Sequence, residues 1–470
     1  MPDVEIGLDW DEAGGQFAVV GERGVVLHNR KYPATPTGAE EVLALFREYA
    51  DPDGTLPWLV MEGTRRPFVR VLQDAGVPAI ACNPNAFGKR NQGRNDSKTD
   101  AKDAVKLVTE SRLAPERFRE QPEPSDDAWA ITLFTRRAKN SVLKVTTLAG
   151  EARSLLAEFF PAALTAYSPL DLGQKPEACA VLTAFPTPTR AAAATLAEIE
   201  QAIRSTGKVR WVKPMAAKTH AAFQQERLQY APGLEADYGE VLVGLLRELK
   251  AAMDNRVLLD EAVRVRVERH FVWDLLSPAP GAGMSVISRV LAEMGDDPAR
   301  FEDKGGLAAF AGVAPKMHQS GEFTGTPGRR SVKGNRLHQA YWDWASSAML
   351  WSPGAMEYYW AHRARGDKHP TAIRKVGRRL ANGTWHCLRT GEVWNEATLW
   401  PGAPTLAEAK GNAQPIRDLV AARRKEAAKA NSKTDLRISK RRKAELAAKT
   451  AKPLRAPVTH LPSLRPPVLR

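Results

Sequence analysis

Residues 91–113, NQGRNDSKTDAKDAVKLVTESRL, carry the most information about the fold and its chemistry. The segment begins with polar residues and glycine and then takes on the apolar spacing of a helix. Asp100 and Asp103 are three residues apart, so a helix projects both carboxylates from one face. Lys98 and Lys102 flank them, as expected of a divalent-metal site near a phosphate backbone, and both lysines are predicted to bind nucleic acid. A solvated helix with Asp–Lys pairs is the alternative.

Upstream of this segment, short apolar runs alternate with helical periods. Strands are predicted at 4–10, 16–20, 25–32, 58–61 and 77–82, and helices at 38–49 and 68–74. Three strands followed by alternating helix and strand predict a mixed α/β sheet. Asp9 lies on the first strand, and Glu62 directly follows a central one. Ligand sites collect where a strand ends beside a helix, so four carboxylates are expected to converge there. Such a set can hold two divalent ions about 3.5–4 Å apart.

The positive charge is concentrated at the C-terminal end. The chain carries a formal net charge of +14, and residues 421–470 contain 15 Lys and Arg against 3 Asp and Glu. The remainder is therefore nearly neutral, and the basic end indicates binding to a polyanion, for which nucleic acid is the expected identity. From 401 onward the composition shifts to Ala, Lys, Arg and Pro, which predicts a segment that is disordered when free.

Composition argues against several classes of protein. The three cysteines are far apart in the chain, so neither a disulfide framework nor a thiolate zinc site is indicated, and a reducing cytoplasm is expected. There is no N-terminal signal pattern and no run of apolar residues long enough to span a bilayer, so no membrane association is expected. A length of 470 residues suggests roughly three domains.

The middle of the chain is predicted to be helical. Apolar residues between 142 and 159 follow the 3-4 spacing of a coiled-coil seam, and a shorter seam runs from 242 to 253. An antiparallel hairpin within one chain and a dimer interface both explain these seams. Residues 168–232 are Ala-rich and predicted to be helical, with no indicated chemistry.

Ser320 and Gly321 form a polar turn in the segment GGLAAFAGVAPKMHQSGEFTGTPGRRSVKGNRLHQAYWDWA (305–345). Without further information, these two residues predict a structural turn. His318, two residues before Ser320, has two interpretations: an exposed loop residue, or a residue that takes part in the chemistry. Cations expected to bind nucleic acid follow the turn: Arg329, Arg330, Lys333 and Arg336. Such cations would hold a phosphate and stabilise the transition state of an attack on phosphorus.

Three motifs resemble the DEDD transposases, the family that includes the Piv/MooV-type DNA invertases: GLDW (7–10), MEGT (61–64) and NPNAFGKRNQGRNDSKTDAKDA (83–104). The resemblance implies an RNase H-like (RuvC-like) fold whose D-E-D-D residues, here Asp9, Glu62, Asp100 and Asp103, hold Mg²⁺ or Mn²⁺. A basic residue often found after the first Asp is absent here, since Trp10, Asp11 and Glu12 follow instead. Asp96 is a secondary candidate ligand.

The same resemblance covers residues 305–345 and makes Ser320 a nucleophile that forms a transient phosphoserine link. It implies a transposase or site-specific recombinase of an insertion sequence that cleaves and rejoins DNA. It also implies a structured guide RNA and an assembly of dimers or tetramers, located in the cytoplasm with the nucleoid. The expected parts are a RuvC-like domain (1–121), a helical coiled-coil region (122–276), a mostly α-helical transposase domain (277–400) and a basic tail (401–470).

Two other functions stay open. A RuvC-like junction nuclease would use the four carboxylates without the serine. An actin-like or sugar-kinase-like ATPase would need a second Gly-rich phosphate loop on a duplicated sheet, and no such repeat is found. No cofactor-binding residues are predicted, because the Gly-rich turn within 277–283 lacks the third glycine and the preceding strand of a dinucleotide motif.

Overall fold

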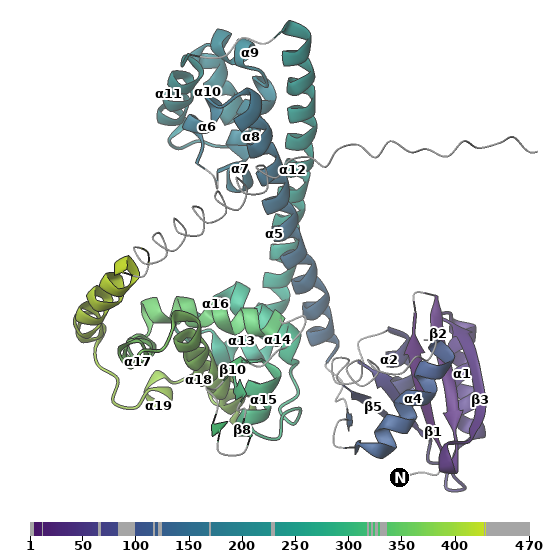
Figure 1. Ribbon diagram of the computed structural model, residues 1–470. Coiled ribbons are helices and arrows are strands. Elements are labelled where there is room, and N and C mark those ends of the chain that lie inside the picture. The colour runs from purple at the N-terminus through teal and green to yellow at the C-terminus, as the bar shows by residue number, and fades with distance from the viewer. Residues whose placement is uncertain are drawn as a thin grey trace, which may run out of the picture.

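The protein consists of a sheet-containing part, a long helical hairpin with a helical head, and a C-terminal helical unit (Figure 1). The computed structural model describes residues 4–11, 13–63, 67–82, 99–115, 118–120, 125–168, 171–226, 231–316, 319–320, 323–324, 328–329, 336–426 and 428. At 119, 232, 316 and in the short strands between 319 and 329, only the backbone is described.

The N-terminal part is a mixed sheet, as the sequence predicts, and it has six strands. Its strands are β1 (Glu5–Trp10), β2 (Gly14–Val20), β3 (Val26–Pro33), β4 (Trp58–Glu62), β5 (Ala79–Cys82) and β6 (Phe118–Glu120), in the order β3-β2-β1-β4-β5-β6. β1, β2 and β3 form an antiparallel meander, and β4 and β5 continue from β1 in parallel. The edge strand β6 was not predicted, because three residues are too few to show a period of two.

Helices cover both faces of this sheet. α1 (Pro36–Glu48) and α2 (Pro67–Asp74) pack on one face, and α4 (Asp100–Leu113) packs on the other. The strand alternation separates the two layers: Ile6 and Leu8 of β1 belong to the core with α1 and α2, whereas Val60 of β4 packs with Leu107 and Val108 of α4. The polar side chains that share the α4 face therefore point toward α4.

α5 (Asp126–Phe159) and α12 (Pro232–Glu268) form the long hairpin. The predicted seams face each other within the chain, since Val145 and Leu156 of α5 are buried in one core with Leu242 and Leu249 of α12. The two helices are antiparallel, and the hydrogen bond from Ser141 Oγ to Ala252 O joins them near the middle. The intramolecular hairpin is thus the alternative that the structure shows.

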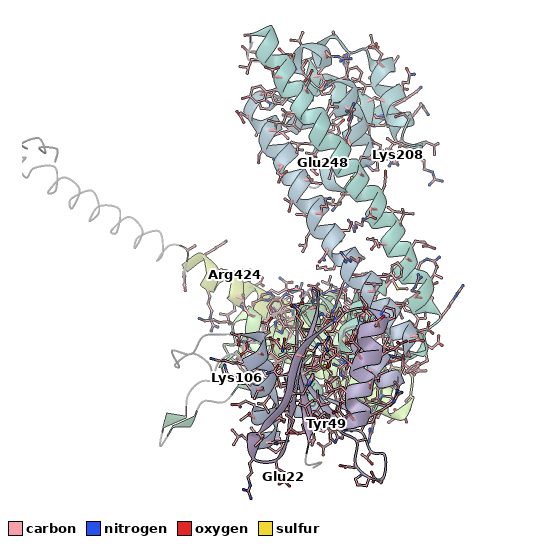
Figure 2. All side chains as sticks on the ribbon, turned by 90° about the vertical axis from the view of Figure 1, so that its right-hand side faces the viewer. Glu22, Tyr49, Lys106, Lys208, Glu248 and Arg424 are labelled. Atoms are coloured by element: carbon pink, nitrogen blue, oxygen red, sulfur yellow. The ribbon has the colours of Figure 1, made fainter. Side chains whose placement is uncertain are left out.

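A helical head closes the far end of the hairpin, which confirms the helical prediction for this region. Its helices are α6 (Ala163–Ala166), α7 (Asp171–Gln174), α8 (Pro176–Ala184), α9 (Pro188–Ala193), α10 (Leu196–Arg204) and α11 (Val212–Phe223). Figure 2 shows Lys208, between α10 and α11, on this head, with Glu248 on the neighbouring hairpin helix α12. The head therefore lies well away from the sheet.

The C-terminal unit is mostly helical, as expected. Its helices are α13 (Phe271–Leu276), α14 (Met284–Met294), α15 (Lys304–Phe310), α16 (Arg336–Trp351), α17 (Pro353–Ala364), α18 (His369–Thr390) and α19 (Glu396–Leu399). Two small ladders join β7 (Pro315–Lys316) to β10 (Gly328–Arg329) and β8 (Gln319–Ser320) to β9 (Phe323–Thr324). Trp344 and Tyr341 of α16 are fully buried and anchor the core of this unit.

Asp296 joins the C-terminal unit to the start of the hairpin. Its Oδ1 accepts a hydrogen bond from the Ser125 backbone N–H at 3.2 Å, and its Oδ2 lies 3.3 Å from His270 Nε2. Ser125 caps α5 and His270 caps α13. Burial raises the pKa of Asp296, but the hydrogen bonds from His270 and Ser125 outweigh it and bring that pKa to about 2.

The expectation of disorder from residue 401 onward is wrong for the first part of that segment. Residues 406–426 are helical, and Ala409 and Ala413 are buried against Met356 of α17. Alanine favours a helix, and alanines spaced four apart give this one an apolar side that the composition argument overlooked. Residues 429–470, which contain most of the Lys and Arg residues of the C-terminal segment 421–470, lie outside the described residues. None of the described helices combines the length and apolar character needed to cross a membrane.

Candidate functional site

The site is organised around the crossing of α4 over β1. A Cβ atom added at Gly7 would lie 1.9 Å from the carbonyl oxygen of Ala104, so glycine is required for α4 to lie this close to the strand. At the C-terminal end of α4, Arg112 Nε donates to the buried carboxylate of Glu5 at 2.8 Å. Other N–H groups of Arg112 donate to the carbonyls of Gly21 and Val20 at 2.6 and 3.0 Å. These contacts fix the height of α4 over the sheet.

The same crossing places Asp9 level with the first turn of α4. Glu5, Gly7 and Asp9 alternate along β1 and so share the face that α4 covers. From Gly7, two strand residues advance about 6.6 Å and four helical residues about 6 Å, so Asp9 lies at the height of Asp100. Asp103 is only 5% exposed and belongs to the side of α4 that faces the sheet.

Glu62 reaches the same place through the register of the parallel strands. Leu8 of β1 pairs with Met61 of β4, so Asp9 and Glu62 follow one step later on neighbouring strands and on the same face. Such strands lie about 4.8 Å apart. Glu62 also pairs with Cys82 of β5, whose pKa is raised to about 12, chiefly by burial and further by the charge of Glu62. The four predicted carboxylates therefore occupy one face at one end of the sheet.

Their side chains do not form a closed ligand set. In the part of the chain that the structure describes, no three His, Cys, Asp or Glu side chains are grouped so that they could hold a metal ion. The Asp100 side chain is exposed, and Asp103 Oδ1 lies 3.4 Å from Lys106 Nζ. The donor chemistry nevertheless suits a hard divalent cation, because every candidate ligand is a carboxylate oxygen.

Lys31 is a cation near these carboxylates that the sequence did not predict. Gln16 pairs with Asp9 across β1 and β2, and Lys31 pairs with Gln16 across β2 and β3, so all three side chains share the α4 face. Lys31 forms an ion pair with Asp11. Its pKa is raised, mainly by the hydrogen bond to Asp11 and to a smaller extent by the charge of Asp100. Strand pairing thus places a cation near Asp9, although no basic residue follows Asp9 closely in the sequence.

A polar chain also connects the meander to the start of α4. Gln16 Nε2 donates to Asn29 Oδ1 at 2.6 Å, and Asn29 Nδ2 donates to the backbone carbonyl of Ala101 at 3.0 Å. The alternation of Asn29 and Lys31 along β3 was the available signal, since polar residues at every second position mark one face of a strand.

Ser320 lies in a different part of the molecule, on the C-terminal helical unit (Figure 1). Its backbone belongs to β8, which pairs with β9, and its side-chain position is not described. The backbone of Arg329 lies in β10, and Arg336 is exposed at the start of α16. Lys102 is exposed in the first turn of α4. The remaining predicted positions lie outside the described residues: Asp96, Lys98, His318, Arg330 and Lys333.

Comparison with known proteins matches both ends of the chain to transposases. Residues 6–161 match a transposase profile of the DEDD IS110 type, and residues 274–360 match the profile "Transposase IS116/IS110/IS902 family". A Streptomyces coelicolor protein assigned as the mini-circle transposase for IS117 is 33% identical over 408 residues, which cover 86% of this chain and 97% of that protein. The uncharacterized 42 kDa protein of insertion element IS900 from Mycobacterium paratuberculosis is 28% identical, covering 83% of this chain and 97% of the relative.

Proposed function

This chain belongs to the IS116/IS110/IS902 family of transposases, and we propose that it is the recombinase of an insertion sequence, with a metal site on the sheet and a nucleophile at Ser320. Family membership indicates an enzyme that cuts and rejoins DNA, and a DEDD transposase domain implies use of a divalent metal. The observation that carries the proposal is the close crossing at Gly7, which brings Asp9 to the height of Asp100, while Asp103 is buried on the side of α4 that faces the sheet.

The strand order supports an RNase H-like (RuvC-like) fold for residues 1–121. An antiparallel meander, two parallel strands and helices on both faces are what that fold requires. Asp9, Glu62, Asp100 and Asp103 would hold Mg²⁺ or Mn²⁺. When bound, such an ion neutralises charge on a phosphodiester and lowers the proton affinity of the attacking oxygen. Lys31 would limit the mutual repulsion of the carboxylates, because its charge lies in the same row.

Ser320 would conserve the energy of the phosphodiester. Its Oγ forms a bond to phosphorus while the bond from phosphorus to one deoxyribose oxygen breaks; the serine gives up a proton, and the leaving oxygen takes one up. Attack by the hydroxyl of another strand reverses these steps and releases the serine. Arg329, Arg330, Lys333 and Arg336 follow Ser320 closely in sequence and would hold the phosphate.

A structured guide RNA and an assembly of two or four chains complete the proposal. Both follow from the family resemblance, and the basic C-terminal segment supports affinity for a polyanion. The carboxylates and Ser320 lie on different parts of the chain (Figure 1), which suits a reaction in which neighbouring copies share the chemistry.

Covalent trapping tests this function. Wild-type protein incubated with a nicked suicide DNA substrate and Mg²⁺ should form a protein–DNA adduct that mass spectrometry maps to Ser320. Ser320→Ala should still bind DNA but give no adduct and no rejoined product. Strand exchange by Ser320→Ala, or an adduct on another residue, would contradict the assignment. Cleavage without any adduct would indicate a RuvC-like nuclease instead.

A further inference from the structure

One side of α18 carries a stripe of cations that the proposed function does not use. Its opposite side is buried in the core of the C-terminal unit through Ile373, Val376 and Leu380. The cations recur at helical spacing and so share one side: Arg374, Lys375, Arg378 and Arg379. This arrangement is amphipathic, and every Lys, Arg, Asp or Glu on the helix is a cation.

The stripe lines a cavity of about 430 Å³ between α18 and α17. Tyr358 and His362 of α17 form the opposite wall, and Val313 and Pro315 complete it. Pro315 begins β7, which leads directly into the segment that carries Ser320. The volume lies within the range of about 300–1,000 Å³ that is usual for ligand sites. The cavity therefore adjoins the proposed nucleophile along the chain.

The described residues that line the cavity carry a net positive charge. No acidic residue is among the described residues that line it. Lys375 Nζ is paired with Asp367 at 2.6 Å, just outside the lining. The Arg379 guanidinium instead lies over the rings of Tyr358 and Trp400, at 5.3 and 5.4 Å from their centroids. The Arg378 side chain is exposed. Stacking orients a guanidinium without neutralising it, so the Arg379 charge stays available to an anion.

Burial and the charge of a neighbouring lysine both act on His362 of the cavity wall. Its Nδ1 lies 3.0 Å from Asp367 Oδ2 and 3.1 Å from Lys375 Nζ. Burial lowers the pKa of His362, and the charge of Lys375 lowers it further, against the opposing effect of Asp367. The imidazole therefore stays neutral at pH 7 and adds hydrogen-bonding capacity rather than another charge.

We propose that this cavity binds backbone phosphates of the DNA strand that approaches the Ser320 hairpin. The inference rests on the proposed function for the presence of DNA, whereas the location of the phosphate-binding site follows from the geometry of the cavity. Guanidinium groups bind phosphate through paired N–H donors, and several of them on one helix side match successive phosphates of a strand. DNA is favoured over RNA because the wall of the cavity continues into the segment with the nucleophile.

Salt dependence of binding tests the proposal in the full-length protein. The probe is a 40-base-pair duplex DNA of arbitrary sequence, since phosphate contacts are independent of sequence. The double variant Arg374→Gln/Arg378→Gln should reduce the slope of log affinity against log salt by about 2, because each lost phosphate contact removes about 0.9. Arg378→Lys keeps the charge and should keep the slope.

Arg389→Gln is the matched control, because Arg389 is an exposed arginine on the same helix outside the cavity. It should leave the slope unchanged. An unchanged slope in the double variant, or an equal fall in the control, would overturn the proposal. Circular dichroism and the unfolding midpoint of Arg378→Gln alone, a surface change, show whether any loss reflects misfolding.

A photoreactive benzophenone side chain at position 378 identifies the nucleic acid. With duplex DNA and a single-stranded RNA of equal length present together, crosslinks to DNA are expected, and the same group at position 389 should give few. Crosslinks to RNA alone would overturn the proposal. These experiments measure binding, so their outcome does not depend on the chemistry of Ser320. If the double variant keeps the wild-type salt slope while Ser320→Ala fails to rejoin DNA, only the role of the cavity is refuted. The expected slope change beside an active Ser320→Ala protein refutes only the proposed chemistry.

Discussion

The carboxylates on the sheet and the cations on α18 are both arrays of like charge, but they are assembled in different ways. Asp9, Glu62 and Asp103 come from separate elements and depend on strand register and on the height of α4. The stripe that contains Arg374 and Arg378 comes from one helix and depends only on its period. The acidic array should therefore be sensitive to small displacements of the backbone, whereas the basic array should be insensitive to them.

Removing a carboxylate should have the largest effect. Asp9→Asn and Glu62→Gln should each lower DNA cleavage by about 10³-fold or more. A metal contributes several kcal/mol to the transition state, and 1.36 kcal/mol corresponds to a factor of ten. Cleavage of a labelled element-end DNA measures the rate, and DNA affinity should stay nearly constant. Glu22→Gln is the control, because Glu22, labelled in Figure 2, follows the end of β2 that pairs with Glu5, whereas Asp9 pairs with Gln16 near the other end of that strand. Full activity of either variant would remove the metal site from the proposal.

Displacing α4 should impair the function of the acidic array and leave the basic array on α18 unaffected. Gly7→Val places a side chain where even a Cβ would lie 1.9 Å from Ala104 O, so α4 must move. We expect a loss of about 3 kcal/mol in the free energy of unfolding of the sheet part and loss of cleavage. The α18 contribution to the salt slope should not change. Gly150→Ala is the control, because no atom of the described residues lies within 4 Å of a Cβ there, and the added helix propensity should slightly stabilise α5. Wild-type cleavage by Gly7→Val would show that the height of α4 is unimportant.

The junction at Asp296 should affect the helical unit and leave the sheet unchanged. Its pKa of about 2 in the folded protein is below the ordinary 3.8. The ionised group therefore contributes about 2 kcal/mol of stability above pH 4, and this contribution is lost as the pH falls toward 2. Asp296→Asn should lower the unfolding free energy of the helical unit by about that amount at pH 7.

The difference between wild type and Asp296→Asn should shrink between pH 4 and pH 2, measured by denaturant unfolding at several pH values. Asp274→Asn, which changes an exposed carboxylate of α13, should show no such pH dependence. A difference that is constant with pH would mean that shape, rather than ionisation, accounts for the effect of Asp296.

The smallest effect is expected in the helical head, which belongs to neither array. Trp211 has a φ of 63° and is 75% exposed, so a bulky residue occupies a left-handed conformation with little burial in return. Trp211→Asn should raise the unfolding free energy by about 0.5–1 kcal/mol, because asparagine tolerates that conformation better. Val209→Asn, at a neighbouring position that is 78% exposed, should change stability by less than about 0.5 kcal/mol. Destabilisation by Trp211→Asn would reveal a contact that offsets the strain.

Much of the sheet could be predicted from the sequence, because its strands are long enough to show alternation and its helices show apolar periods. β6 escaped prediction because it is only three residues long. The proximity of Asp9, Gln16 and Lys31 was not predicted, because strand pairing, rather than distance along the chain, makes these residues neighbours. The helix at 406–426 escaped because composition suggested a solvated segment, whereas Ala409 and Ala413 pack on α17.

What the sequence determined by itself are the properties that follow from local period. These are the strands and helices, the shared helix face of Asp100 and Asp103, and the family, which the motifs around Asp9 and Glu62 identify. What only the tertiary structure decided are contacts between distant segments. α4 lies over β1 at the height that Gly7 permits, and the cations of α18 line a cavity that α17 helps to form. A local pattern states which side of an element is polar, but only the packing of other elements against it decides what that side meets.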